Sequence, residues 1–134
     1  MIPTSIEGSC ACGAIRYRAV SKPSISMICH CESCRRSAAV PVVAWLTFPK
    51  DSFRFIHGQP ALFKSSASVR RTFCALCGTP LTYENAARTS EVDVTTCSLD
   101  DPDAFPPAHH AWLRDDLSWV HFGDQLERFP ESKS

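Results

Sequence analysis

Short stretches of alternating apolar and polar residues recur along the chain. In the stretch 14–20, Ile15 and Tyr17 fall on one face and Arg16 and Arg18 on the other, which is the pattern of a half-buried strand. Further stretches of this kind predict short strands at 24–29, 42–48, 53–56, 69–74, 80–84 and 92–97.

Helical periodicity is weak by comparison. The best helix candidates are two short segments, 32–37 and 102–105, and no window carries a sustained apolar stripe. Ten prolines and five glycines separate the predicted strands at a spacing typical of turns. We therefore expect an all-β protein, built as one domain over residues 1–134, with small sheets that are held together partly by metal.

Composition supports an ordinary folded protein. A chain of 134 residues with 44% hydrophobic and 21% charged residues suits one globular domain. Residues 1–8 do not have the pattern of a secretory leader, and the longest apolar stretch, 38–46, is too short to cross a bilayer. We expect a cytoplasmic protein without a membrane partner, in which clustered cysteines bind metal rather than form disulfides.

The formal charges are divided unevenly along the sequence. Residues 1–74 carry ten Lys and Arg against three Asp and Glu, whereas residues 75–134 carry four against eleven. The zero total argues against general binding of nucleic acid, which depends on neutralising many phosphates. Either the basic half steers a small anionic substrate, or the two halves meet on the folded surface and cancel.

Two of the three cysteine motifs end in glycine. Cys74 and Cys77 form a Cys-x-x-Cys motif, and Cys10 and Cys12 form a Cys-x-Cys motif. Together they can supply the four thiolates of a closed tetrahedral zinc site, which would join segments about sixty residues apart. The alternative for Cys74 and Cys77 is a redox dithiol, which requires a parallel sheet and a helix starting at the motif.

The third motif places Cys29, Cys31 and Cys34 within six residues. Three thiolates can hold one zinc ion and leave its fourth position free, as in catalytic zinc sites. The alternative is a structural site closed by a fourth protein ligand. Candidates for that ligand are Cys97, His109 and His110, whereas His30 lies between two ligands and would point away in an extended segment.

Three thiolates on a divalent cation give a centre of net charge −1. Such a centre is poor at generating hydroxide but can hold an incoming thiol as its thiolate, which is a strong nucleophile. Arg35 and Arg36 follow the motif directly. They offset this negative charge, grip a substrate carboxylate, or simply form a solvated turn.

The cysteine motifs, taken with their neighbours, resemble one known family. The similar segments are 8–17, 29–35 and 73–81, followed by 98–102 and 110–112, and then by Trp119, Asp124, Leu126 and Phe129. Over nearly the whole chain they are similar to the glutathione-dependent formaldehyde-activating enzyme family, which also contains centromere protein V.

This resemblance implies an Mss4-like fold of several coiled β-sheets and two zinc ions. It assigns a structural zinc to Cys10, Cys12, Cys74 and Cys77. It assigns a catalytic zinc to the remaining motif of Cys29, Cys31 and Cys34. The implied activity is that of a carbon–sulfur lyase which adds glutathione to formaldehyde. The rival hypothesis is a non-enzymatic zinc module that binds a protein or nucleic-acid partner; the sequence leaves the oligomeric state open.

Overall fold

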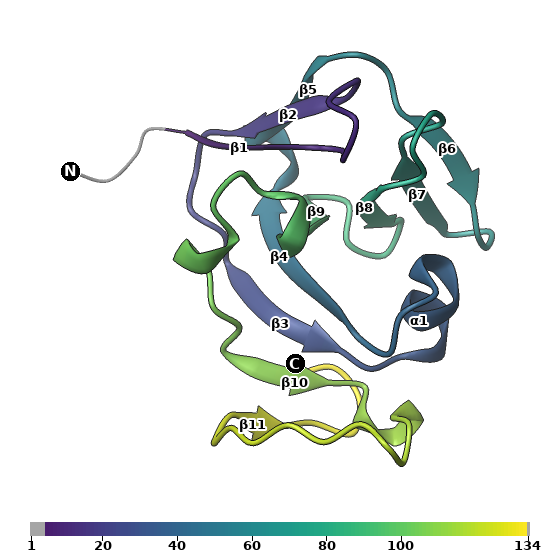
Figure 1. The fold of residues 1–134 in the computed structure, drawn as a ribbon, viewed down its shortest axis with the longest axis vertical. Coiled ribbons are helices and arrows are strands. Elements are labelled where there is room, and N and C mark those ends of the chain that lie inside the picture. Colours follow the sequence, from purple (N-terminus) through teal and green to yellow (C-terminus); the bar gives the residue numbers. More distant parts are fainter. Residues whose placement is uncertain (1–4, 134) are drawn as a thin grey trace.

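The computed structural model describes residues 5–133, and it is mainly β, which confirms the predicted fold class (Figure 1). The strands form two sheets. The smaller sheet has the strand order β1-β2-β5 and is antiparallel throughout. Its strands are β1 (Ile6–Ser9), β2 (Arg16–Ala19) and β5 (Phe53–His57).

The larger sheet has eight strands in the order β11-β10-β3-β4-β9-β8-β7-β6. Its neighbours pair antiparallel except at β10, which pairs parallel with both β3 and β11. The strands are β3 (Ile25–Cys29), β4 (Val43–Pro49), β6 (Ala61–Lys64), β7 (Val69–Phe73), β8 (Pro80–Asn85), β9 (Glu91–Thr95), β10 (His109–Ala111) and β11 (Glu127–Arg128).

One α-helix, α1 (Glu32–Ala38), is present among the described residues, close to the predicted 32–37. No helix in residues 5–133 is long and apolar enough to cross a membrane. The predicted segment 102–105 forms a short 3-10 helix. The 3-10 helices are Lys50–Ser52, Thr96–Ser98, Pro102–Ala104 and Leu113–Asp115.

The predicted strand over 92–97 runs too far. The strand β9 ends at Thr95, and the next three residues turn as a 3-10 helix in which the Leu99 amide donates to the carbonyl of Thr96. The sequence pattern also did not predict β1, β6, β10 and β11. These strands are short, with two to four residues each, so they offer little alternation to detect.

The strand β4 is buried on both of its faces. The hydrophobic core packs against one face of the larger sheet, and the candidate site lies on the other face. Leu46 and Phe48 are completely buried in a core that also contains Tyr17 from the smaller sheet. Trp45 and Thr47 point to the other face, because successive side chains of a strand alternate. Trp45 packs in a second cluster with three cysteines, which are described below.

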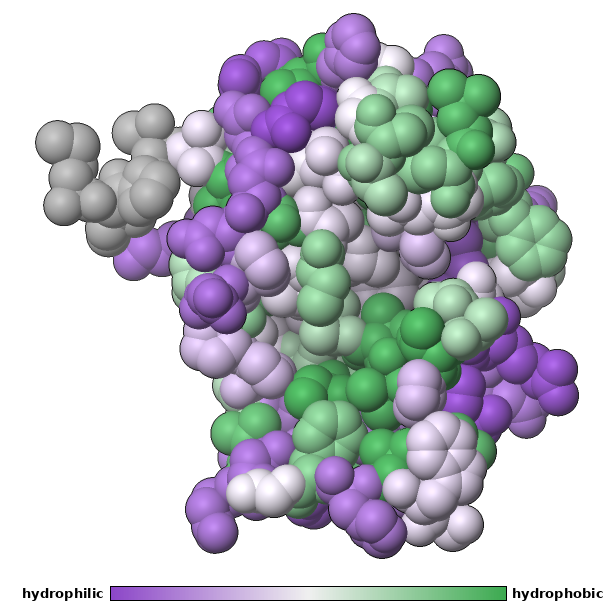
Figure 2. Space-filling view, viewed as in Figure 1, coloured by the Kyte–Doolittle hydropathy of each residue, from purple (hydrophilic) through white to green (hydrophobic). Residues whose placement is uncertain are grey.

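The larger sheet curls around this second face. In Figure 1 the helix α1, which follows β3, lies close to β6 and β7 at the far end of the sheet. Figure 2 shows that the lower part of this view, over β3 and β10, is more apolar than the rim. The curl therefore brings residues from both ends of the sheet to one pocket.

The uneven charges of the two chain halves partly cancel in the fold. Arg16 from the basic half contacts Asp100 from the acidic half at 2.6 Å, and it also pairs with Glu7. Lys50 similarly pairs with Glu84 at 3.0 Å. At these surface positions the fold therefore agrees with the second alternative, in which the two halves of the chain meet and their charges cancel.

Candidate metal centres and pocket

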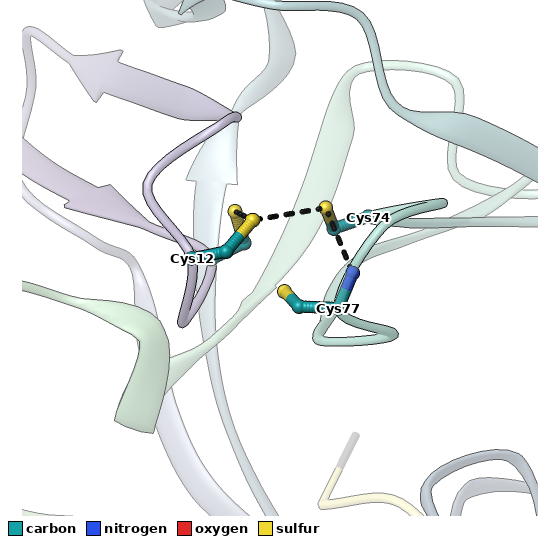
Figure 3. Close-up of side chains that lie close together, drawn as sticks. Cys12, Cys74 and Cys77 are labelled. Atoms are coloured by element: carbon teal, nitrogen blue, oxygen red, sulfur yellow. Dashed lines mark hydrogen bonds between the residues drawn. The ribbon is translucent and has the colours of Figure 1, made fainter.

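Four cysteine side chains meet where the turn between β1 and β2 faces the turn between β7 and β8 (Figure 3). The sulfurs of Cys10, Cys12, Cys74 and Cys77 all lie within 4.8 Å of one another. The Sγ atom of Cys12 is 3.6 Å from that of Cys10 and 3.8 Å from that of Cys74. Thiolates about 2.3 Å from a tetrahedral zinc ion lie about 3.8 Å apart, so this spacing fits the metal.

The two turns that supply these sulfurs share a left-handed glycine and a backbone amide that donates to a cysteine sulfur. Gly13 and Gly78 each follow the second cysteine of their motif with a φ of 81°, a conformation that favours glycine. The amide of Ile15 donates to the Sγ atom of Cys10 at 3.3 Å. The Sγ atom of Cys74 accepts a hydrogen bond from the amide three residues later at 3.5 Å. Backbone donors therefore point at the sulfurs, as thiolate ligands require.

The rest of this site also favours thiolates over a redox dithiol. Hydrogen bonds from Thr79 lower the pKa of Cys77 to about 5. The motif of Cys74 and Cys77 leads into the antiparallel strand β8, without the helix that a thioredoxin-type dithiol needs. All eight cysteines are free thiols. The four sulfurs can thus hold a metal ion that joins two distant turns.

The second cluster lies at the junction of β3 and α1. Cys29 ends β3, Cys31 caps the helix and Cys34 occupies its first turn. The three sulfurs lie within 4.8 Å of one another, and the Cys31 sulfur accepts the Cys34 amide at 3.3 Å. This cap holds Cys34 beside Cys31, because the first helical turn brings the amide of Cys34 to the sulfur of the N-cap residue.

The three thiols of this cluster share negative charge. Hydrogen bonds from Cys29 and Cys34 lower the pKa of Cys31 to about 2, and contact with Cys31 raises the pKa of Cys29 far above its usual range. A single thiolate is therefore stabilised by its two neighbours. Ionising all three thiols at this distance requires a cation, and a divalent metal supplies it. The donor set thus fits a metal ion.

The candidate fourth ligands do not belong to this sulfur group. Among residues 5–133, the group of potential ligands within 4.8 Å of one another contains Cys29, Cys31 and Cys34 alone. Cys97 is exposed and belongs to neither cysteine group. His109 lines the same pocket as the three sulfurs without joining the group.

His30 and His110 form a buried chain of hydrogen bonds that ends at Asp124. Nε2 of His30 lies 2.9 Å from Nδ1 of His110, and Nε2 of His110 lies 3.0 Å from a carboxylate oxygen of Asp124. The side chains of both histidines are almost completely buried. Burial lowers the pKa of His30, and hydrogen bonding to His110 lowers the pKa of Asp124. His110 therefore binds the carboxylate, and His30 is held away from the sulfurs.

The arginine beside the sulfurs is not one of the two expected from the sequence. Arg35 donates to the carbonyl of Asp115, and the exposed Arg36 pairs with Glu32. Instead, the buried Arg71 places Nη1 and Nη2 at 4.0 and 3.9 Å from the Sγ atom of Cys34. Arg71 lies thirty-seven residues after Cys34, so only the curl of the sheet brings them together.

All three sulfurs of the second cluster line a pocket of about 940 Å³ on the inner face of the larger sheet. Alternate residues of neighbouring strands form its floor, including Met27, Trp45, Thr47, Arg71 and Tyr83. Five basic and two acidic side chains lie on its wall, which gives the pocket a positive balance. A small anionic ligand would be attracted to it.

Comparison with known proteins identifies the family. Residues 5–115 match the family described as glutathione-dependent formaldehyde-activating enzyme. The match spans both cysteine clusters and most of the chain. The chain belongs to this family. Membership confirms the resemblance that the three cysteine motifs indicated.

Individual proteins are also similar to the chain. A Schizosaccharomyces pombe protein named as an uncharacterized lyase is 34% identical over 77 residues, which cover 58% of this chain and 56% of the relative. The match therefore spans just over half the length of that relative. A Rhodobacter sphaeroides protein of known crystal structure has a TM-score of 0.59 and 18% identity, covering 92% of this chain and 98% of its own. This second likeness supports the fold of the chain alone.

Proposed function

We propose that the chain is a zinc-dependent enzyme of the carbon–sulfur lyase type, which adds a small thiol such as glutathione to a small aldehyde such as formaldehyde. One observation carries the proposal. Within residues 5–133, three sulfurs form a metal-ligand set without a fourth protein donor, and all three line a positively balanced pocket. Family membership and the relative named as a lyase support the same class of reaction.

In this proposal zinc has two roles in the chain. Cys10, Cys12, Cys74 and Cys77 hold a structural ion. A second ion held by the three-cysteine set would lower the pKa of a thiol bound to it. The eight free thiols of the chain suit a reducing compartment, which agrees with a cytoplasmic location.

The residues of the pocket bind and orient the substrates. Arg36, Arg114 and Lys133 lie on its wall and can attract the carboxylates of glutathione. Tyr83 and Trp112 supply apolar surface beside the sulfurs. In the addition, a sulfur–carbon bond forms, the π bond of the carbonyl breaks, and the thiol proton passes to the carbonyl oxygen. No oxidant or reductant is consumed.

The direct test is to mix the zinc-loaded protein with glutathione and formaldehyde and to follow formation of the adduct by exchange NMR. We expect an exchange rate clearly above that of the buffer reaction. Cys34→Ser should reduce the enzyme-dependent part of this exchange rate at least tenfold, because the substitution removes one of the three sulfur ligands. Cys97→Ser is the matched control and should keep the parental rate, since Cys97 lies outside both clusters.

A parental rate equal to the uncatalysed rate would refute formaldehyde and glutathione as the substrates. The rival role as a non-enzymatic zinc module makes a different prediction for the metal itself. In that case the visible spectrum of the Co²⁺-substituted protein would not change when glutathione is added. In the enzyme, a thiol that becomes the fourth ligand changes the coordination and therefore the spectrum.

A further inference from the structure

Arg71 is an unusual cation within the described part of the chain. Its side chain is 8% exposed, and its Nε atom is buried without a hydrogen-bond partner. Its guanidinium group lies over the ring of Tyr83, 4.8 Å from the ring centroid. Burying a charged group is costly unless an opposite charge or hydrogen bonds compensate for it. The compensating partner therefore indicates what Arg71 does.

Carboxylates do not provide that compensation. Among residues 5–133, Arg71 has no Asp or Glu oxygen within 4.0 Å, unlike Arg88, which binds the buried Asp93 at 2.9 Å on the same face of the sheet. The acceptor that Arg71 does reach is the Sγ atom of Cys34, through both Nη atoms. The buried positive charge thus faces the sulfur cluster.

The charges explain why a buried cation belongs at this position. A divalent metal with three thiolates carries a net charge of −1, and an anionic sulfur as fourth ligand would bring it to −2. An arginine in contact with one of the thiolates reduces these totals to 0 and −1. In a partly buried site this difference is large, because charges there are poorly screened. Arginine also stays protonated at any pH of interest.

From this geometry we propose that Arg71 is the counter-charge of the three-cysteine metal site and favours the binding of an anionic sulfur as its fourth ligand. The inference rests on the proposed function and adds a specificity-determining residue to it. Arg71 acts through Cys34 and the charge of the centre. It does not need to contact the carboxylates of the substrate.

The test compares Arg71→Gln with Arg70→Gln in the full-length protein. The two substitutions remove the same charge from adjacent residues of β7, but Arg70 is exposed and lies on the other face of the strand. Each protein is loaded with Co²⁺, and the visible spectrum is titrated with 2-mercaptoethanol. This thiol lacks a carboxylate, so its affinity reports the effect of charge on the sulfur alone.

We expect Arg71→Gln to weaken binding of 2-mercaptoethanol at least tenfold and to weaken binding of Co²⁺ at the three-cysteine site. Arg70→Gln should change both by less than twofold, and Arg71→Lys, which keeps the charge, should recover most of the loss. The inference is overturned if Arg71→Gln binds 2-mercaptoethanol like the parent. The same titration is made with 3-mercaptopropionate, a small thiol that carries a carboxylate. The inference is equally overturned if Arg71→Gln loses affinity for 3-mercaptopropionate alone, because Arg71 would then bind the carboxylate.

Failure of the inference and failure of the proposed function give different results. If the parent protein does not bind either thiol, the proposed function is wrong. If the parent binds both and Arg71→Gln binds them equally well, only the role of Arg71 is wrong. Should Arg71→Gln not fold, ¹⁵N NMR of the arginine side chains in the parent protein provides the second measurement. The Arg71 signals must shift when the site is loaded with Cd²⁺, and unchanged signals contradict the proposal.

Discussion

Gly8 lies where β1 passes directly over Tyr17. A β-carbon at this position would collide with the hydroxyl end of Tyr17 and with the carbonyl oxygen of Ser98. The Tyr17 hydroxyl is itself hydrogen-bonded to the Ser98 hydroxyl at 2.6 Å, and the ring is completely buried. The close approach therefore leaves no room for a side chain at position 8.

We expect Gly8→Ala to lower the free energy of unfolding by about 1–3 kcal/mol, the usual cost of inserting a methyl group into a packed core. Urea denaturation at neutral pH measures this loss directly. Gly123→Ala serves as the control, because a β-carbon at Gly123 meets nothing within 4 Å. Equal stability of the two variants would contradict the close packing of β1 on Tyr17.

Single residues also show what sequence reasoning reached and what it did not. The seven cysteines of the two clusters were predicted as ligand sets because the members of each motif are neighbours in sequence, and because the two motifs followed by glycine were taken together as one four-thiolate set. The structure brings them together in those sets, and their role as zinc ligands remains a proposal. Arg71 was missed, and Arg35 and Arg36 were considered instead, because they follow the motif directly. Contact between Arg71 and Cys34 depends on the curl of a sheet, which residue spacing does not encode.

At the scale of elements, β10 connects the second cluster to the C-terminal part of the chain. It is inserted in parallel between β3 and β11, and all three of its residues are buried. Burial lowers the pKa of His109 below its usual value of about 6.5. The folded protein thus keeps this ring neutral at a pH where the unfolded chain would protonate it.

This burial makes the stability of the protein depend on pH. As the pH falls from 7.5 to 5.5, the unfolded state takes up a proton at His109 that the folded state resists, so the free energy of unfolding decreases. We expect the decrease to be smaller in His109→Gln, which cannot take up that proton. Urea denaturation of both proteins at the two pH values measures the difference. An identical decrease in parent and variant would contradict this role of His109.

The elements that the sequence predicted well are those of five to seven residues that carry a mostly apolar or an alternating pattern. The strand β4, its neighbours β3 and β9, and the strand β8 beyond β9 were located in this way. The strand β10 escaped detection because His109 and His110 are polar residues that are buried by pairing with Asp124, Phe129 and neighbouring strands. A hydrophobic pattern does not contain that information, since it counts histidine as polar although histidine is intermediate in burial.

At the scale of the whole molecule, the four-cysteine cluster joins two turns that belong to different sheets. Cys10 and Cys12 follow β1, whereas Cys74 and Cys77 follow β7 of the larger sheet. A metal that binds only the folded arrangement stabilises it by about 4 kcal/mol when its free concentration is a thousand times its dissociation constant. A metal bound at this cluster would therefore contribute to the stability of the whole fold.

Removal of the metal should destabilise the protein globally. We expect a strong chelator to lower the midpoint of thermal unfolding by about 10 °C or more, given that 1 kcal/mol corresponds to several degrees in a domain of this size. Cys77→Ser should produce most of this decrease without chelator, whereas Cys97→Ser should not. Differential scanning calorimetry measures all three effects. A parental midpoint that is insensitive to chelator would show that the cluster does not bind metal in the folded protein.

The separation of the ligands along the sequence also sets an order of events during synthesis. The three sulfurs of the second cluster lie within six residues, so a nascent chain can capture an ion there once Cys34 has left the ribosome. Arg71 emerges much later, and the other cluster is incomplete until Cys77 follows it. The three-cysteine set could therefore bind an ion before the strands that shape the pocket have folded, whereas the four-cysteine set could do so only after Cys77, while β8 to β11 are still to follow.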